Sequence, residues 1–190
     1  MIGIDVMVSR RTISSEEALA IAQKPPKKLF WQTGSVSELA AGTITLEKRF
    51  YPYWFAHVVA YADRTPFRPK IYNYLVYLDG NSGRGGLVGR IPEAESAEVC
   101  RGDVFLPRLS AEKDVRIKLA VVQQEVIRRQ FLLKGPHQEV REFRLIYLPV
   151  WLALLQTADR KGIKVINALS GELETKIADT LSACKEMLAV

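Results

Sequence analysis

Phe50-Tyr51-Pro52-Tyr53-Trp54 decides the fold, because it returns 97 positions later (147 − 50) as Tyr147-Leu148-Pro149-Val150-Trp151. Two more segments recur in the same order. Ile13–Glu17 resembles Leu109–Lys113 at an offset of 96 (109 − 13), and Tyr77–Gly83 resembles Val165–Gly171 at an offset of 88 (171 − 83). Three ordered matches at nearly one offset indicate a duplicated supersecondary unit. The repeat predicts an architecture and does not identify a reaction.

The composition is that of a globular protein. The chain has 190 residues, of which 48% are hydrophobic and 25% charged, and both values are ordinary for a folded domain. No apolar run reaches the ~20 residues that span a bilayer, and the first residues lack the basic flank of a secretory signal. We therefore expect a cytoplasmic protein without membrane insertion. Cys100 and Cys184 lack the spacing of a disulfide or metal motif and are expected to be buried thiols.

The positive charge is spread evenly. Residues 1–95 carry 12 Lys/Arg and 9 Asp/Glu, and residues 96–190 carry 15 and 12, so each half contributes +3 to the net charge of +6. A nucleic-acid-binding protein usually concentrates its charge in a basic stripe or arm. The densest clusters here are short: Lys24 with Lys27-Lys28, Arg64 with Arg68 and Lys70, and Arg128-Arg129. This pattern disfavours nucleic acid as the partner.

Each half of the chain predicts the element order β-α-β-β. The first half is expected to contain a strand at 4–8, a helix capped by Ser14 or Ser15 and ended by Pro25-Pro26, a helical turn at 36–41, strands at 43–62 and 71–78, and an edge strand at 83–89. The second half is expected to contain a strand at 104–106, a helix at 111–133 capped by Ser110, a strand at 140–157, a tight turn at 159–162, a returning strand at 162–167 and a final helix at 172–188. The two helices are expected to carry apolar stripes, Val115, Leu119, Val122 and Val126 in the first, and Ile177, Leu181, Cys184 and Leu188 in the second. Residues 96–102 are polar and are predicted to be the linker.

The strand at 43–62 is apolar or aromatic on both faces. One face carries Trp54, Ala56 and Val58, and the other carries aromatic residues in alternate positions. A strand with one solvated face would alternate with polar residues, so both faces must be covered, by the other repeat or by a second subunit. The repeated Pro-x-Trp pattern is expected to aim Trp54 and Trp151 at a helix.

Short motifs give no catalytic or metal-binding signature. Asp79–Gly83 and Asn167–Gly171 have the composition of polar turns, with glycine where a positive φ is needed. Gly83-Arg84-Gly85-Gly86 does not open a helix, as a phosphate-binding glycine loop would. His57 and His137 are the two histidines, and no zinc or Ser-His-Asp pattern includes them. No catalytic residue, metal ligand or cofactor is therefore predicted.

The two Ser-Gly turns and the Pro-x-Trp strands resemble PepSY-type repeats and segments of uncharacterised bacterial proteins. The residues that carry the resemblance are Leu78-Asp79…Ser82-Gly83 and Ile166–Leu173, together with the two Pro-x-Trp strands that precede them. The resemblance implies a small cystatin-like module, a helix on a sheet, that binds or restrains another protein without catalysis.

These observations predict an α+β fold. Two tandem β-α-β-β repeats, cystatin- or PepSY-like, at 1–95 and 103–190 with a linker at 96–102, would form an antiparallel sheet with helices packed on one face; the two could also merge into one domain. The expected function is a non-catalytic protein-interaction or regulatory module with a protein partner or as a homodimer. One alternative is a small-molecule-binding protein or enzyme with a pocket between sheet and helix, lined by Tyr53, His57, Tyr72 and Tyr74. The other is a basic nucleic-acid-associated protein. The candidate surface residues are Tyr51, Tyr53, His57, Tyr61, Tyr72 and Tyr74.

Overall fold

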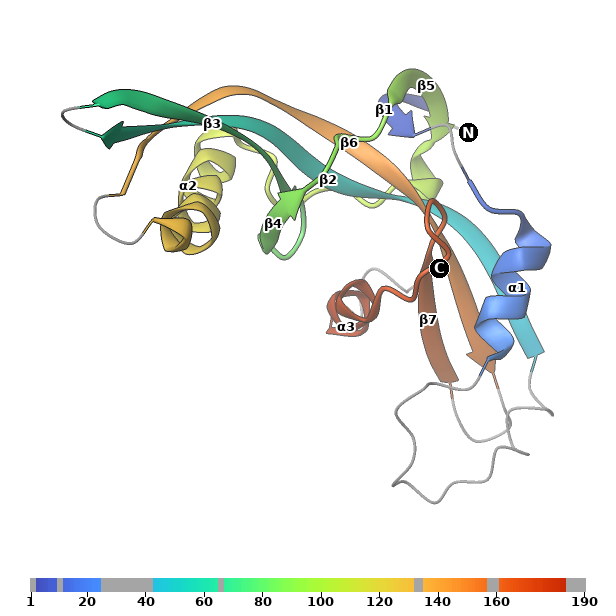
Figure 1. Ribbon diagram of the computed structural model, residues 1–190. Helices are drawn as coiled ribbons and strands as arrows, with labels where there is room; N and C mark the ends of the chain where they lie inside the picture. Colours follow the sequence, from blue (N-terminus) through green and yellow to red (C-terminus); the bar gives the residue numbers. More distant parts are fainter. Residues whose placement is uncertain are drawn as a thin grey trace. The chain divides into compact units, whose positions relative to one another are not determined.

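The computed structural model of the protein describes residues 3–9, 12–24, 43–64, 67–131, 135–156 and 161–183. In this part of the chain, seven mostly antiparallel strands and three α-helices give the predicted α+β fold (Figure 1). The strands are β1 Gly3–Ser9, β2 Thr43–Arg64, β3 Phe67–Asp79, β4 Gly85–Val88, β5 Ala94–Cys100, β6 His137–Gln156 and β7 Lys161–Asn167. The helices are α1 Ser15–Gln23, α2 Glu112–Val122 and α3 Thr175–Ala183. The strand order is β4-β3-β2-β6-β1-β5, and β7 pairs with β6.

The chain forms two compact units that interleave the two sequence halves. Unit 1 contains residues 1–9, 51–101 and 105–147, and unit 2 contains residues 10–50, 102–104 and 148–190. Each unit therefore takes segments from both of the predicted repeats, 1–95 and 103–190. Strands β2 and β6 are long enough to supply residues to both units.

In unit 1, helix α2 packs on one face of β2 and β3 (Figure 1). Helix side chains one turn apart, Val115, Leu119 and Val122, are buried against the strands as the predicted apolar stripe requires. The core that they form also contains Ala56, Val58, Ala60, Val76, Leu78 and Ile127. Burial of this apolar stripe explains why α2 is stable although it lacks a side-chain cap.

Helix α2 differs at both ends from the prediction of one helix at 111–133. Ala111 is the N-cap and makes no side-chain cap hydrogen bond, so the expected cap at Ser110 is wrong. After Val122 the chain continues as a π-helical turn, Gln123–Ile127, and a 3-10 turn, Arg128–Gln130. The wider π-turn places Ile127 in the core, where a regular helix would have placed Val126.

In unit 2, helix α1 packs on β6 and β7. The small side chains Ala18 and Ala22 are fully buried against Ala153 and Ile166, which lets the helix approach the strands closely. The predicted cap is confirmed at Ser14, which forms a capping box with Glu17. At the other end of α1, the Lys164 ammonium group donates to the carbonyls of residues 22 and 24 at 2.5 and 3.0 Å. Burial lowers the pKa of Lys164.

Two segments expected to be irregular or short differ from the prediction. Residues 94–100, placed mostly in the linker, form strand β5, which pairs with β1 along its whole length. The polar residues suit this position because β5 is the last strand in the sheet order and three of its seven residues are exposed. The strand expected at 104–106 is reduced to one parallel bridge between Val104 and Phe50. The bridge between Val8 and Tyr147 occupies the equivalent position of the other repeat.

Several other predictions concern residues that the structure describes only in part. The helical turn at 36–41, the residues 157–160 of the expected tight turn, and Cys184 and Leu188 of the final helix lie outside the described ranges. Strand β7 already begins at Lys161, and α3 buries Ile177 and Leu181 as expected. Cys100 is exposed at the end of β5, so the expectation of a buried thiol is wrong there.

The two polar turns make the same hydrogen bonds at equivalent positions. The Asp79 carboxylate accepts hydrogen bonds from the N–H groups two and three residues later at 2.8 and 2.9 Å. The side-chain oxygen of Asn167 does the same at 2.8 and 3.3 Å. Gly83 and Gly171 have φ values of +69° and +74°, which confirms that glycine serves the left-handed position of each turn.

Asp79 and its equivalent should tolerate exchange of Asp and Asn but not truncation. Asp79→Ala is expected to lower the free energy of unfolding by at least ~2 kcal/mol, because it leaves buried donors, including the Tyr51 hydroxyl, without their acceptor. Asp79→Asn keeps the acceptor oxygen that Asn167 provides in the second turn, and should cost about 1 kcal/mol or less. Urea denaturation of both variants measures the difference, and equal midpoints would contradict this role of the side chain.

The Pro-x-Trp strands connect each half of the chain to the other. The Trp54 indole N–H donates to the carbonyl of Leu109 at 2.9 Å, just before α2. The Trp151 indole N–H donates to the carbonyl of Ile13 at 3.3 Å, just before α1. Each tryptophan is therefore aimed at the start of a helix, as expected, but the helix belongs to the other half of the sequence. This exchange explains why the compact units do not coincide with 1–95 and 103–190.

Candidate functional site

Both faces of β2 are covered within unit 1. On the α2 face Ala56, Val58 and Ala60 are almost fully buried, and on the opposite face Tyr51 and Phe55 are 0% and 3% exposed. The expectation that both faces must be covered is confirmed, and it is met by the chain itself. The sequence left two covers open, the other repeat or a second subunit, and the structure does not require the second subunit for this purpose.

The six candidate residues do not form one surface. Tyr51, Tyr53, His57 and Tyr61 alternate along β2 and lie on the face opposite α2. In the register of β2 with β3, Tyr72 is opposite Ala60 and Tyr74 is opposite Val58, so both lie on the α2 face. A pocket between sheet and helix lined by Tyr53, His57, Tyr72 and Tyr74 would need side chains from both faces of the sheet. The structure therefore separates the lining that the sequence suggested.

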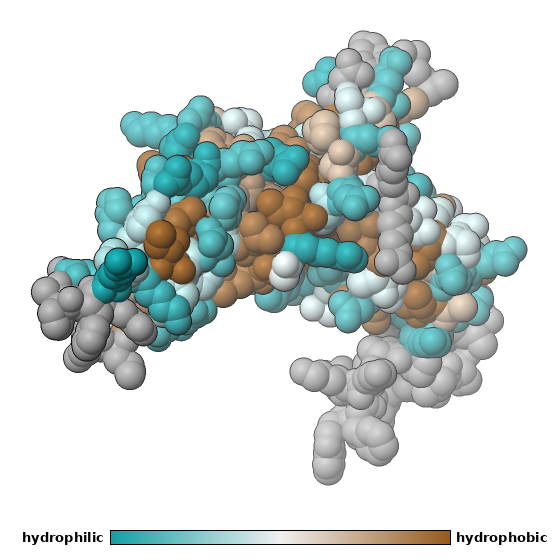
Figure 2. Space-filling model, turned by 45° about the horizontal axis from the view of Figure 1, so that its top comes forward, coloured by the Kyte–Doolittle hydropathy of each residue, from teal (hydrophilic) through white to brown (hydrophobic). Residues whose placement is uncertain are grey.

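On the face opposite α2, two of the candidates are part of the aromatic packing. Tyr51 is buried, donates to the Asp79 carboxylate at 3.1 Å, and contacts the Phe105 ring at 5.8 Å between ring centroids. The half-buried Tyr53 contacts the rings of Phe55 and Tyr77 at 6.3 and 6.1 Å. Both side chains stabilise the sheet through these contacts. Figure 2 shows hydrophobic residues gathered in the middle of the face that it presents, between hydrophilic ones.

His57 and Tyr61 lie in a polar part of the same face. His57 hydrogen-bonds to the Asn73 side chain at 3.2 Å. The Tyr61 hydroxyl accepts from Arg141 at 2.7 Å and donates to Glu139 at 3.4 Å, while Arg141 and Glu139 also form an ion pair. The hydrogen bond with Tyr61 raises the pKa of Arg141, and the negative charge of Glu139 adds to the effect. The charges of Arg141 and Glu139 compensate each other in this cluster.

Tyr72 and Tyr74 stack on the α2 face, with ring centroids 6.3 Å apart and an interplanar angle of 17°. The Lys70 ammonium group lies 4.8 Å from the centre of the Tyr72 ring, and Phe131 meets that ring edge-on at 5.3 Å. The Tyr74 hydroxyl donates to Gln130 at 3.1 Å. Burial raises the pKa of Tyr74, and repulsion from Tyr72 adds to the effect. Both rings are half-buried, and both hold the turn that follows α2.

The outer edge of β3 is the feature that the sequence analysis did not identify. Strand β4 pairs with β3 only from Leu75 to Leu78. In the described part of the chain, no strand pairs with the outer side of β3 from Phe67 to Tyr74. Unpaired backbone groups of this kind form a template for another strand. The sequence carried no signal for this edge, because the expected strands at 71–78 and 83–89 are nearly equal in length, whereas β3 has 13 residues and β4 four.

The direction of the free backbone groups follows from the turn. The Asp79 N–H donates to the Arg84 carbonyl at 2.7 Å, so it points to the β4 side of β3. Backbone groups in a strand alternate in direction with every residue, and the pairing with β2 is regular from Asp79 to Lys70. The N–H and C=O groups of Asn73 and Ile71 therefore point outward from the edge. Ile71 is 55% exposed, an apolar side chain next to these groups.

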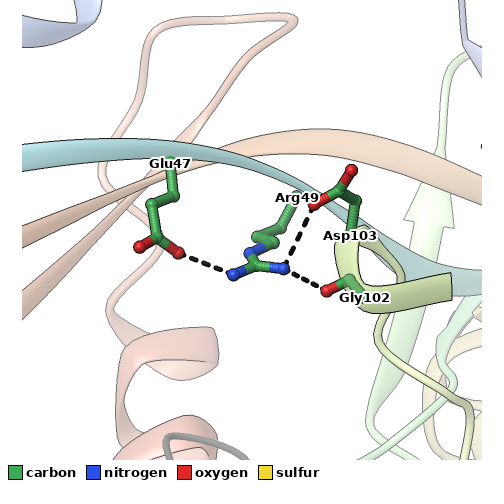
Figure 3. A network of polar contacts seen from close by, with 4 residues as sticks. All are labelled: Glu47, Arg49, Gly102 and Asp103. Atoms are coloured by element: carbon green, nitrogen blue, oxygen red, sulfur yellow. Dashed lines mark hydrogen bonds and ion pairs between the residues drawn. The ribbon is translucent and has the colours of Figure 1, made fainter. Parts of the chain in front are cut away.

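A second polar cluster, in unit 2, has a structural role (Figure 3). The Arg49 guanidinium donates to the Gly102 carbonyl and to the Asp103 carboxylate at 3.2 Å, and it pairs with Glu47 at 2.7 Å. Only 19% of the Arg49 side chain is exposed. One guanidinium group thus donates to three acceptors. These hydrogen bonds hold residues 102 and 103, between the two halves of the sequence, next to β2.

Among the residues that the structure describes, no group of three or more His, Cys, Asp and Glu side chains is arranged to hold a metal ion. No helix in the described ranges is long and apolar enough to cross a membrane.

Comparisons with known proteins found no match for the chain. No protein-family model matches the chain, and neither a curated protein nor a solved structure shows significant similarity to it.

Proposed function

We propose that the protein is a non-catalytic interaction module that binds an extended segment of another protein at the outer edge of β3. The observation that carries this proposal is the row of outward backbone groups at Ile71 and Asn73, which no described strand covers. An added strand would form main-chain hydrogen bonds there, as in other cases of strand addition to a sheet. The aromatic packing around Tyr72 and Tyr74 holds the edge in place from the α2 side.

The arrangement of the polar side chains supports binding rather than catalysis. The groups with possible acid-base chemistry, His57, Tyr61, Glu139 and Arg141, are hydrogen-bonded among themselves or to Asn73. An acid-base catalyst needs a group that can reach the proton it transfers on a substrate. Here the hydrogen bonds join neighbouring side chains of the sheet surface, which is the usual arrangement in a stabilising surface network.

Selection of random peptides on the immobilised protein tests this function without assuming the chemistry of the partner. Peptides that bind at the edge should lose binding to Asn73→Pro, which removes an outward N–H group, and keep it with Asn73→Ala. Both variants lose the side-chain contact with His57, so their difference isolates the backbone donor. Circular dichroism checks that both variants are folded. Failure to enrich any peptide, or binding that Asn73→Pro leaves unchanged, would refute the proposal.

A further inference from the structure

The side chains around the β3 edge define which kind of segment fits it. We infer that the edge recognises an extended protein segment in which apolar and acidic residues alternate. This inference rests on the proposed function and names the class of partner for the same surface. It follows from the alternation of side chains along β3 and from the charges on its α2 side.

The two faces of the edge differ in polarity. Side chains in a strand alternate between faces, so Ile71 and Asn73 lie with Tyr61 and His57, while Lys70 and Tyr72 lie on the α2 face. A residue of an added strand on the first face would lie beside the exposed Ile71 and is best apolar. Its neighbours in sequence would lie on the α2 face, beside Lys70 and Tyr72. The surface therefore selects a segment that alternates with period two.

Positive charge gathers on the α2 side of the edge. Lys70 lies over the Tyr72 ring, and the 3-10 turn that carries Arg128 and Arg129 is held against the strand by contacts of Gln130 with Tyr74 and of Phe131 with Tyr72. The side chains of Lys70, Arg128 and Arg129 are exposed. Lys70 and the Arg128-Arg129 pair, which come from two of the short basic clusters in the sequence, thus lie on the same face of β3. Acidic residues on this side of an added strand would complement them.

Nucleic acid and a second copy of the chain fit this edge less well. Single-stranded nucleic acid needs aromatic faces on which bases stack, but the Tyr72 ring is already covered by Lys70 and contacted by Tyr74 and Phe131. Pairing of two β3 edges would bring their basic side chains together. Strand β5 of a second copy would also fit poorly, because its acidic residues Glu95 and Glu98 are three residues apart and lie on opposite faces, so they do not alternate with apolar residues as required.

A fluorescent peptide of alternating valine and glutamate tests the inference on the intact protein, with a valine–lysine peptide as the comparison. Fluorescence anisotropy should show binding of the acidic peptide alone, with an affinity that falls as salt is added. Lys70→Glu combined with Arg128→Glu should weaken that binding about tenfold or more, because like charges then face each other. The same variant should gain affinity for the valine–lysine peptide. Lys113→Glu with Arg101→Glu changes the net charge equally at other exposed positions and should have little effect.

Four results would overturn the inference. The first two are equal binding of both peptides and acidic-peptide binding that Asn73→Pro leaves intact. The third is a single-stranded oligonucleotide that displaces the acidic peptide from Lys70 and Arg128. The fourth is a dimer, detected by light scattering, that depends on the β3 edge. If random peptides of a different chemistry bind and need the Asn73 N–H group, the proposed function stands and the alternating acidic segment does not. If no peptide of any kind needs that group, both fail.

Discussion

Trp54→Ala and Trp151→Ala are each expected to lower the free energy of unfolding by about 3 kcal/mol, the lower end of the range for large aromatic truncations. Trp54 packs against the core of unit 1 and contacts the Phe143 ring at 5.5 Å, and Trp151 packs against the small residues of α1. Each variant also removes the donor that holds the segment before a helix. Chemical denaturation of both variants measures the loss.

The phenylalanine variants separate the ring from the hydrogen bond. Trp54→Phe and Trp151→Phe keep most of the packing and lose the indole donor, so about 1 kcal/mol should be lost in each. The effect should be larger for Trp54, whose hydrogen bond is shorter, 2.9 Å against 3.3 Å. Near-native midpoints for both alanine variants would show that the tryptophans are not structural and would make them candidate binding residues.

The second large effect is expected when the chain is cut between β4 and β5. A protease site introduced at the exposed Gly89-Arg90 should be cleaved, and the two fragments, about residues 1–90 and 91–190, should remain associated in native buffer. Unit 1 needs α2 from the second fragment to cover β2 and β3, and unit 2 needs α1 from the first to cover β7. Separation of the fragments in urea should therefore coincide with loss of secondary structure in both.

Size-exclusion chromatography and circular dichroism of the cut protein, before and after denaturant, measure this association. An uncut sample of the same variant is the control for the inserted site. Each fragment isolated in urea and returned to buffer alone should lack a cooperative unfolding transition, because its apolar strand face or helix stripe has nothing to pack against. Two fragments that separate in native buffer and unfold cooperatively on their own would show that the sequence halves are the folding units.

Local features of the fold could be predicted because their signals are contained in short stretches of sequence. The capping box at Ser14, the left-handed glycines at Gly83 and Gly171, and the stripe Val115, Leu119 and Val122 depend on neighbours within a few residues. Failures such as Ser110 as a cap and a continuous helix to residue 133 occurred where packing against β2 and β3 set the geometry. The π-turn at Gln123–Ile127 is one example, since it serves to bury Ile127.

The six candidate residues lie on two faces of the sheet instead of one surface, for a reason of topology. Alternation along β2 correctly grouped Tyr51, Tyr53, His57 and Tyr61, but the face of Tyr72 and Tyr74 depends on the register between β2 and β3. A shift of one residue in that register would exchange the faces. The free edge of β3 depends on where β4 stops pairing, and local sequence does not specify that end point.

The sequence by itself determined the α+β class, the strands and helices with strong periodicity, and the repeated Pro-x-Trp and Ser-Gly segments. Only the tertiary structure decided which helix covers which hairpin. The reason is that the two halves carry nearly equivalent donors, acceptors and apolar faces: Leu109 and Ile13 each offer a carbonyl before a helix, and Trp54 and Trp151 each offer a donor. The local sequence pattern is the same for both arrangements. Whether each tryptophan contacts the helix of its own half or that of the other half therefore depends on chain connectivity and long-range packing.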